Sequence, residues 1–90
     1  MTNELFEDLV NKALTALPSD LQQHAAEVLV VTMSNPPRGA PEKSLVAFVQ
    51  GPTRLRFEVY KSAFDRGTDE EVLEKLKTVV DEEFGFYFGC

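Results

Sequence analysis

Few residues in this sequence have the types and spacing that catalysis requires. The chain contains one histidine, His24, and one cysteine, Cys90. Histidine is the usual general acid or base near neutral pH, but the position of His24 on a helical segment favours a role on the helix flank. A nucleophile must be held in place, and Cys90 is the last residue of the sequence, where a chain is least constrained. We therefore predict no catalytic residue and no enzymatic activity.

Metal and cofactor sites are not indicated either. Zinc sites combine several Cys and His ligands, and this chain has one of each. The acidic segment 65–71 lacks the alternating acidic ligands of a calcium-binding loop. The glycines stand singly and do not form a phosphate-binding loop. The sequence thus predicts neither a bound metal nor a cofactor.

Three consecutive acids stand near the end of the last helical pattern, which we expect to end at Gly85. They are Asp81, Glu82 and Glu83. Negative charge at the C-terminal end of a helix costs up to about 1 kcal/mol for each residue. Glu83 also follows Leu76 by seven residues, which would place it on the apolar stripe of a continuous helix. Solvated acids in a frayed last turn explain this pattern, and an anionic patch for a basic partner is the alternative.

The same segment is rich in aromatic residues. Phe84, Phe86, Tyr87 and Phe88 are four of the nine aromatic residues in the chain. Some of them must complete the core, but so short a segment cannot bury all four, and we expect one or two to remain accessible. Aromatic anchors beside charged residues are typical of protein interfaces. We predict a partner-binding site that consists of Asp81, Glu82, Glu83, Phe86, Tyr87 and Phe88.

Length and composition indicate one small globular domain. The chain has 90 residues, of which 43% are hydrophobic, so we expect a single domain over 1–90 with a thin core. Residues 34–43 contain three prolines and form a Pro-rich loop within that domain. The acidic first segment does not resemble a secretory signal, and no apolar run reaches the ~20 residues of a membrane span. We expect a cytoplasmic protein, which an unpaired thiol also favours.

The net charge of −6 is unevenly distributed along the chain. Residues 1–35 hold five acidic residues and one basic residue, residues 36–61 two and five, and residues 62–90 eight and three. Direct binding to nucleic acid or to an anionic membrane requires a basic surface, so we expect neither. A basic surface on another protein is the electrostatically favoured partner.

Hydrophobic periodicity predicts the helices. Apolar residues recur at helical spacing from Leu5 to Leu17, Pro18 ends that helix, and Ser19 begins a shorter one. The apolar arc of the first helix covers about half of its circumference, so it must contact two elements or a second chain. Thr68 and Glu71 have the spacing of a capping box, which marks the start of the last helix.

Three segments have strand character. Val28–Met33 is an apolar, β-branched run that favours a buried strand, with a continued helix as the alternative. Residues 44–50 and 53–60 flank Gly51-Pro52 as a hairpin in which Phe48 faces Leu55. One face of this hairpin is a consistent core face, formed by Val46, Phe48, Leu55, Phe57 and Val59. Residues 86–90 form a short final strand or fold back over the helix.

These elements predict an α+β fold. We expect a small two-layer domain in the order helix, short helix, three-stranded antiparallel meander, helix. The predicted function is that of a small acidic, non-enzymatic protein that binds another protein. An inhibitor or antagonist would dock its acidic and aromatic face on a basic surface, for example that of a nucleic-acid-handling machine. The alternative is a homodimeric accessory or chaperone-like subunit, suggested by the wide apolar arc of the first helix.

Overall fold

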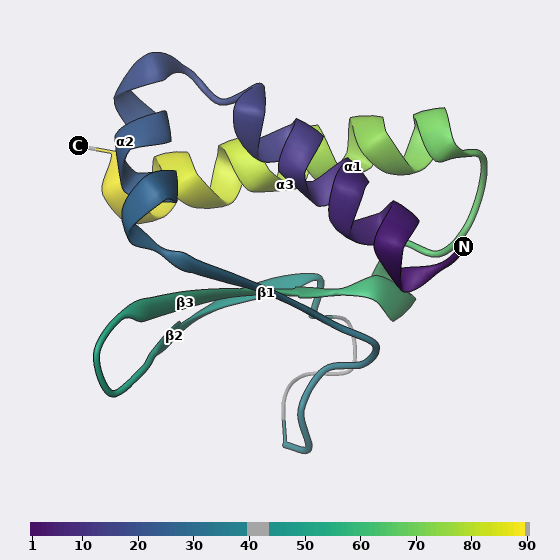
Figure 1. Ribbon diagram of the computed structural model, residues 1–90, viewed down its shortest axis with the longest axis horizontal. Helices are drawn as coiled ribbons and strands as arrows, with labels where there is room; N and C mark the ends of the chain where they lie inside the picture. The colour runs from purple at the N-terminus through teal and green to yellow at the C-terminus, as the bar shows by residue number, and fades with distance from the viewer. Residues whose placement is uncertain (40–43, 90) are drawn as a thin grey trace.

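Three helices cover one face of a three-stranded sheet, as Figure 1 shows for the computed structural model. The structure describes residues 1–39 and 44–89. Predictions that concern residues 40–43 of the Pro-rich loop, or Cys90, lie outside the described residues. The elements are α1 (Asn3–Thr15), α2 (Ser19–Glu27), β1 (Leu29–Met33), β2 (Val46–Gln50), β3 (Leu55–Tyr60), a 3-10 turn (Lys61–Ala63) and α3 (Asp69–Phe88). The predicted α+β class is confirmed.

The sheet is mixed, and the predicted antiparallel meander is wrong. Its strand order is β1-β3-β2, with β1 parallel and β2 antiparallel to β3. Parallel neighbours need a long crossover connection, which residues 34–54 supply with β2 as part of the path. The chain therefore reaches the far edge of the sheet before β3 returns to the centre. Composition identifies a strand but not its neighbour, so the strand order does not follow from the sequence pattern.

The individual strand predictions are otherwise close. The run Val28–Met33 contains β1, which settles the choice between strand and helix in favour of the strand. In the hairpin, Phe48 faces Phe57 instead of Leu55, so the predicted register is wrong by two residues. The turn is wider than expected, with the Gly51 N–H donating to the Arg54 carbonyl at 3.0 Å. A shift of two residues keeps every side chain on its face, so the predicted core face is retained.

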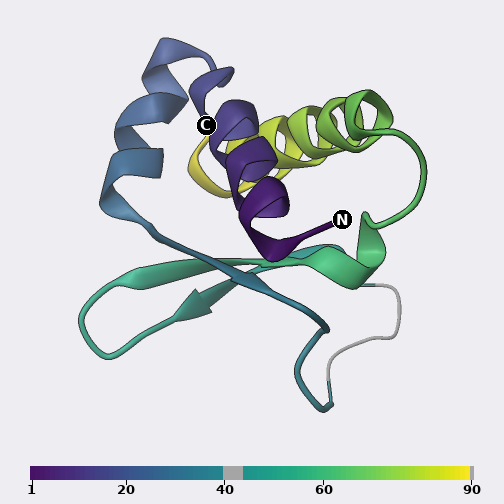
Figure 2. The ribbon, with the colours of Figure 1, turned by 45° about the vertical axis from the view of Figure 1, so that its right-hand side comes forward.

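The core lies between the sheet and the helices. Phe57 and Val59 on β3 are buried beneath a stripe on α3, and α1 contributes further apolar side chains. The stripe on α3 consists of Val72, Leu76, Val80 and Phe84. In Figure 2, α1 lies over the sheet and beside α3, while α2 leads down to β1. Contacts within one chain thus account for the wide apolar arc of α1, so that arc no longer favours a second chain.

The last helix is longer than the sequence suggests. The predicted capping box is present: the Glu71 N–H donates to Thr68 Oγ1 at 3.2 Å, and the Thr68 N–H donates to Glu71 Oε1 at 3.0 Å. The helix continues through Gly85 and ends at Phe88, where Gly89 is the C-cap. Gly85 is therefore not the stop, and residues 86–88 are helical instead of a final strand.

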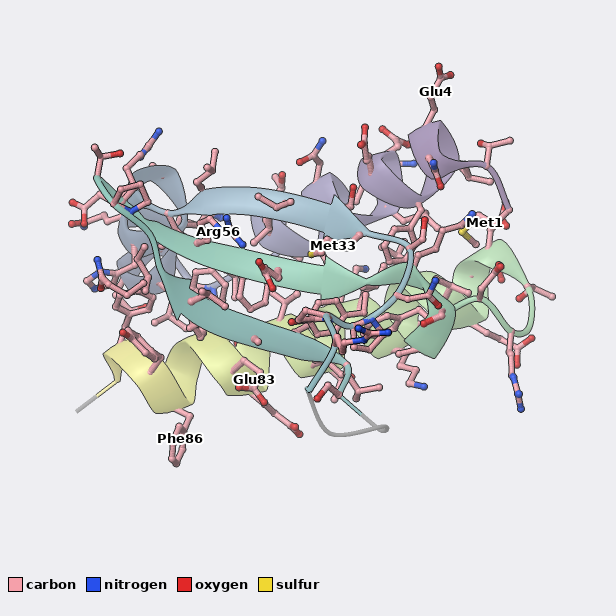
Figure 3. All side chains as sticks on the ribbon, turned by 90° about the horizontal axis from the view of Figure 1, so that it is seen from below. Met1, Glu4, Met33, Arg56, Glu83 and Phe86 are labelled. Atoms are coloured by element: carbon pink, nitrogen blue, oxygen red, sulfur yellow. The ribbon has the colours of Figure 1, made fainter. Side chains whose placement is uncertain are left out.

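The face of the sheet opposite the helices carries a polar row on its central strand. Arg56, Glu58 and Tyr60 alternate with the core residues of β3, and Figure 3 shows this face with Arg56 labelled. Glu58 is only 2% exposed, forms an ion pair with Arg56 and accepts a hydrogen bond from the Tyr60 hydroxyl at 2.9 Å. Burial and this hydrogen bond to Glu58 raise the pKa of Tyr60 to about 12.

This pKa shift predicts a loss of stability in alkali. The unfolded Tyr60 ionises near 10.0, whereas the folded residue keeps its proton until about pH 12. The contribution of Tyr60 is therefore complete below pH 10 and is lost as the pH rises to 12, by up to about 1.4 kcal/mol per pH unit. Urea unfolding of the wild type and Tyr60→Phe between pH 9 and 12 measures this loss. Parallel stability curves for the two proteins would contradict the assignment.

Candidate interaction surface

The predicted site residues lie in the last two turns of α3. Because this helix continues to Phe88, Asp81, Glu82 and Glu83 lie more than a turn before its C-terminal end. The unfavourable effect of the helix dipole falls off within the last turn, so the predicted cost of these acids is largely absent. The acids lie in continuous helix, so the frayed last turn that explained them in the sequence analysis is not observed.

An aromatic cluster centred on Phe48 holds this part of α3 against the sheet. The Phe48 ring stacks on Tyr87 with a centroid distance of 4.3 Å, and meets Phe84 at 5.2 Å and Phe88 at 5.6 Å. Phe57 on β3 closes the cluster with a centroid distance of 4.9 Å to Phe84. Five aromatic rings, two from the strands and three from the helix end, thus fix the position of the last helical turns.

A second contact ties the helix end to α2. The His24 ring stacks on Phe88 at a centroid distance of 4.2 Å and an interplanar angle of 8°. His24 lies on the flank of α2, as its helical position predicts, and its ring takes part there in an aromatic contact. The contribution of Phe48 and His24 was missed, because no local pattern links residues so distant in sequence.

Phe86 alone among the four aromatic residues of this segment projects away from the protein. Its side chain is 90% exposed, against 50% for Tyr87, while Phe84 is buried and Phe88 is partly buried. Figure 3 shows Phe86 directed away from the sheet, beyond the β2 edge, on the side where Glu83 also lies. The largest share of the exposed aromatic surface of this segment therefore belongs to the Phe86 ring.

Glu83 does not lie on the buried stripe, contrary to the sequence prediction. The buried residues of α3 follow one another at steps of four, and each such step turns by about 40° around the helix axis. Over the two steps from Leu76 to Phe84 the buried side therefore turns by about 80° around the helix. Glu83, seven residues after Leu76, is left outside the buried side. Glu83 is exposed, and Glu82 and Glu83 flank Phe86 at helical spacings of four and three residues.

The structure divides the six predicted residues into separate groups. Glu82, Glu83 and Phe86 share one exposed side of α3, which we call the acidic–aromatic surface. Asp81 projects further round the helix and, with Glu82, lines a shallow hollow against α1 that includes Ala13 and Ala16. Tyr87 and Phe88 belong mainly to the aromatic cluster, where they support the surface instead of forming it.

The charge of the acidic–aromatic surface is not neutralised within the described chain. Ion pairs among residues 1–39 and 44–89 join Met1 to Asp65, Lys12 to Asp8, Arg56 to Glu58 and Lys77 to Glu74. None of these pairs includes Glu82 or Glu83. Their carboxylates therefore face solvent beside an exposed aromatic ring, an arrangement that suits a cationic partner group.

Other kinds of site, and comparisons with known proteins, give no further evidence on function. Within the described part of the chain, no group of three His, Cys, Asp or Glu side chains is placed to hold a metal ion. No helix in that part has the length and apolar character to cross a membrane. Comparison with known protein families finds no family that matches, and comparison with curated proteins finds no significant match. The acidic–aromatic surface is therefore the feature of the molecule that bears on its function.

A pair of substitutions distinguishes support from surface. Phe84→Ala removes a buried ring that contacts Phe48 and Phe57, and we expect it to lower the free energy of unfolding by about 3–5 kcal/mol. Phe86→Ala removes an exposed ring and should change that free energy by less than about 0.5 kcal/mol. Chemical denaturation of both variants measures the difference. A destabilised Phe86→Ala protein would mean that this ring is structural.

Proposed function

We propose that this protein is a non-enzymatic binding module that docks the acidic–aromatic surface on a basic surface of another protein. The observation that carries the proposal is Phe86, a large apolar side chain 90% exposed on a helix end that an aromatic cluster of five rings holds in place. A single exposed apolar residue is ordinary, but this one is flanked by two carboxylates that form no ion pair within residues 1–39 and 44–89.

The energetics favour Phe86 as the anchor of such an interface. Complete burial of a phenylalanine side chain contributes about 1.5–3 kcal/mol, and aromatic residues dominate many interface hot spots. The helix end is already ordered by its contacts with Phe48 and His24. Binding therefore costs little ordering of the backbone, which leaves more of the burial energy for affinity. Glu82 and Glu83 at the rim would favour cationic partners and speed their association.

An inhibitor of a nucleic-acid-handling protein is the specific form of this proposal. The carboxylates of Glu82 and Glu83 would occupy positions that phosphates take in a basic groove, and Phe86 would fill a neighbouring apolar pocket. The uneven charge supports this orientation, since residues 62–90 are acidic while residues 36–61 are basic. The acidic end of α3 would face the partner.

The alternative of a dimeric accessory subunit has lost the observation that suggested it. Phe6, Leu9, Val10 and Ala13 of α1 are buried within one chain. Leu5 and Leu14 also pack against the same core. The dimer hypothesis stays a prediction, with no contact in the described residues that requires it.

Retention of a basic partner by the immobilised protein tests the proposal. We expect the immobilised wild type to retain such a partner from a lysate of its native host. A DNA oligonucleotide should release the partner if the partner binds through a nucleic-acid groove. Phe86→Ala should reduce retention at least tenfold, which corresponds to 1.4 kcal/mol of an anchor's contribution. The double variant Glu82→Gln, Glu83→Gln should also reduce retention of the partner. This reduction should be larger at low salt than at high salt, because salt screens surface charges.

A matched control keeps the test specific to this surface. Glu4→Gln with Glu74→Gln removes the same charge from exposed positions on α1 and on an earlier turn of α3. This control should retain the partner at the wild-type level. If the control and the surface variants lose retention equally, the effect comes from net charge and not from this surface. Unchanged retention by Phe86→Ala would overturn the proposal.

A further inference from the structure

The edge strand β1, like the other edge strand β2, lacks the charged residues and prolines that often protect a sheet edge. It lies at one end of the strand order, yet Leu29–Met33 contains no charged residue, no proline and no glycine. Natural sheets protect their edges with lysine, proline or bulges, because an open apolar edge pairs with other strands. Leu29 is 44% exposed on this strand, one of three large hydrophobic side chains so exposed in the described chain. An edge without protection suggests a strand that pairs.

The outer edge of β1 borders a groove beneath α1. In residues 1–39 and 44–89, no backbone hydrogen bond joins the outer edge of β1 to another segment, because its pairing is with β3. The groove is lined by Glu7, Val10 and Asn11 from α1 and by Val30, Val31 and Thr32 from β1. Thr32 Oγ1 donates a hydrogen bond to Glu7 Oε1 at 3.1 Å, which places that carboxylate at the strand.

The position of α1 limits what can occupy this edge. Figure 3 shows the N-terminal part of α1, with Glu4 labelled, extending past the β1 edge of the sheet. A strand added to β1 would lie beneath this part of the helix, in the groove. This groove suits a single extended segment, whose side chains on the helix side would meet the Glu7 carboxylate and Asn11.

The alternation of side chains on an added strand determines its chemistry. Side chains on the helix side would meet Glu7 and Asn11, while those on the other side would continue the row Leu29, Val31 and Met33. Among the described residues that line the groove, Glu7 is acidic and none is basic. We propose that the β1 edge binds an extended peptide segment of a partner, with basic side chains beneath α1 alternating with aliphatic side chains on the open face of the sheet.

This site is separate from the acidic–aromatic surface. Glu83 and Phe86 lie beyond the β2 edge in Figure 3, on the opposite side of the sheet from β1 and Glu4. The two proposals rest on different residues, so each can fail without the other. A partner could engage either surface or both.

Titration with a capped Lys-Val-Lys-Val-Lys-Val-Lys peptide tests the inference by amide hydrogen exchange and calorimetry. We expect slower exchange at the amides of β1 and one peptide bound per protein. Glu7→Gln should weaken binding about fivefold, the effect of an ion pair near the surface. Val31→Lys places a cation on the edge strand opposite Glu58 and should abolish binding while the protein stays folded. A peptide with Glu in place of Lys should not bind.

Three results would overturn the inference. Absence of binding by the Lys-Val peptide removes it directly. Binding that is lost in Glu82→Gln or Phe86→Ala, but kept in Val31→Lys, assigns the peptide to the acidic–aromatic surface. A wild-type protein that sediments as a dimer, and becomes a monomer in Val31→Lys, assigns the edge to a second copy of this chain.

Discussion

The contact between Phe48 on β2 and the aromatic residues of α3 is the interaction on which the rest of this structure depends. Phe48 meets Phe57, Phe84, Tyr87 and Phe88 at centroid distances between 4.3 and 5.6 Å. Aromatic pairs at such distances contribute about 0.5–1.5 kcal/mol beyond the burial of their area. In a domain whose core is thin, this cluster joins the edge strand, the central strand and the last helix in one unit.

The cluster also explains how an acidic and glycine-containing segment remains helical. Glycine inside a helix costs about 1 kcal/mol relative to alanine, and no basic residue stands in the last turn of α3. Burial of Phe84 and packing of Tyr87 and Phe88 on Phe48 offset both effects. Since Gly85 is helical, Phe86 is carried to the exposed side with Glu82 and Glu83 next to it. One packing interaction thus creates both the stability of the helix end and the surface proposed to bind a partner.

Local features of the fold follow from sequence, and long-range ones do not. Thr68 and Glu71 cap α3 as their spacing predicts, and the alternation around Phe57 identifies the core face of the hairpin, because both depend on near neighbours. The parallel pairing of β1 with β3 depends on the path of a long connection, and hydrophobic periodicity does not predict that path. The site was predicted as six equivalent residues, but tertiary packing of Tyr87 and Phe88 separates them from Phe86. The burial of Glu58 does not follow from the sequence. Glu58 alternates with Arg56 and Tyr60 on the face opposite the core, and this pattern is that of an exposed polar face.

Photo-crosslinking from position 86 tests the central claim most directly. The protein would carry a photoreactive phenylalanine analogue at Phe86 and, in a matched control, at Thr78, an exposed position of the same helix. The account predicts a crosslink at position 86 to a basic partner protein, weaker at high salt, and little or none at position 78. Equal crosslinking from both positions, or none from position 86 to a partner that the wild type retains, would contradict it.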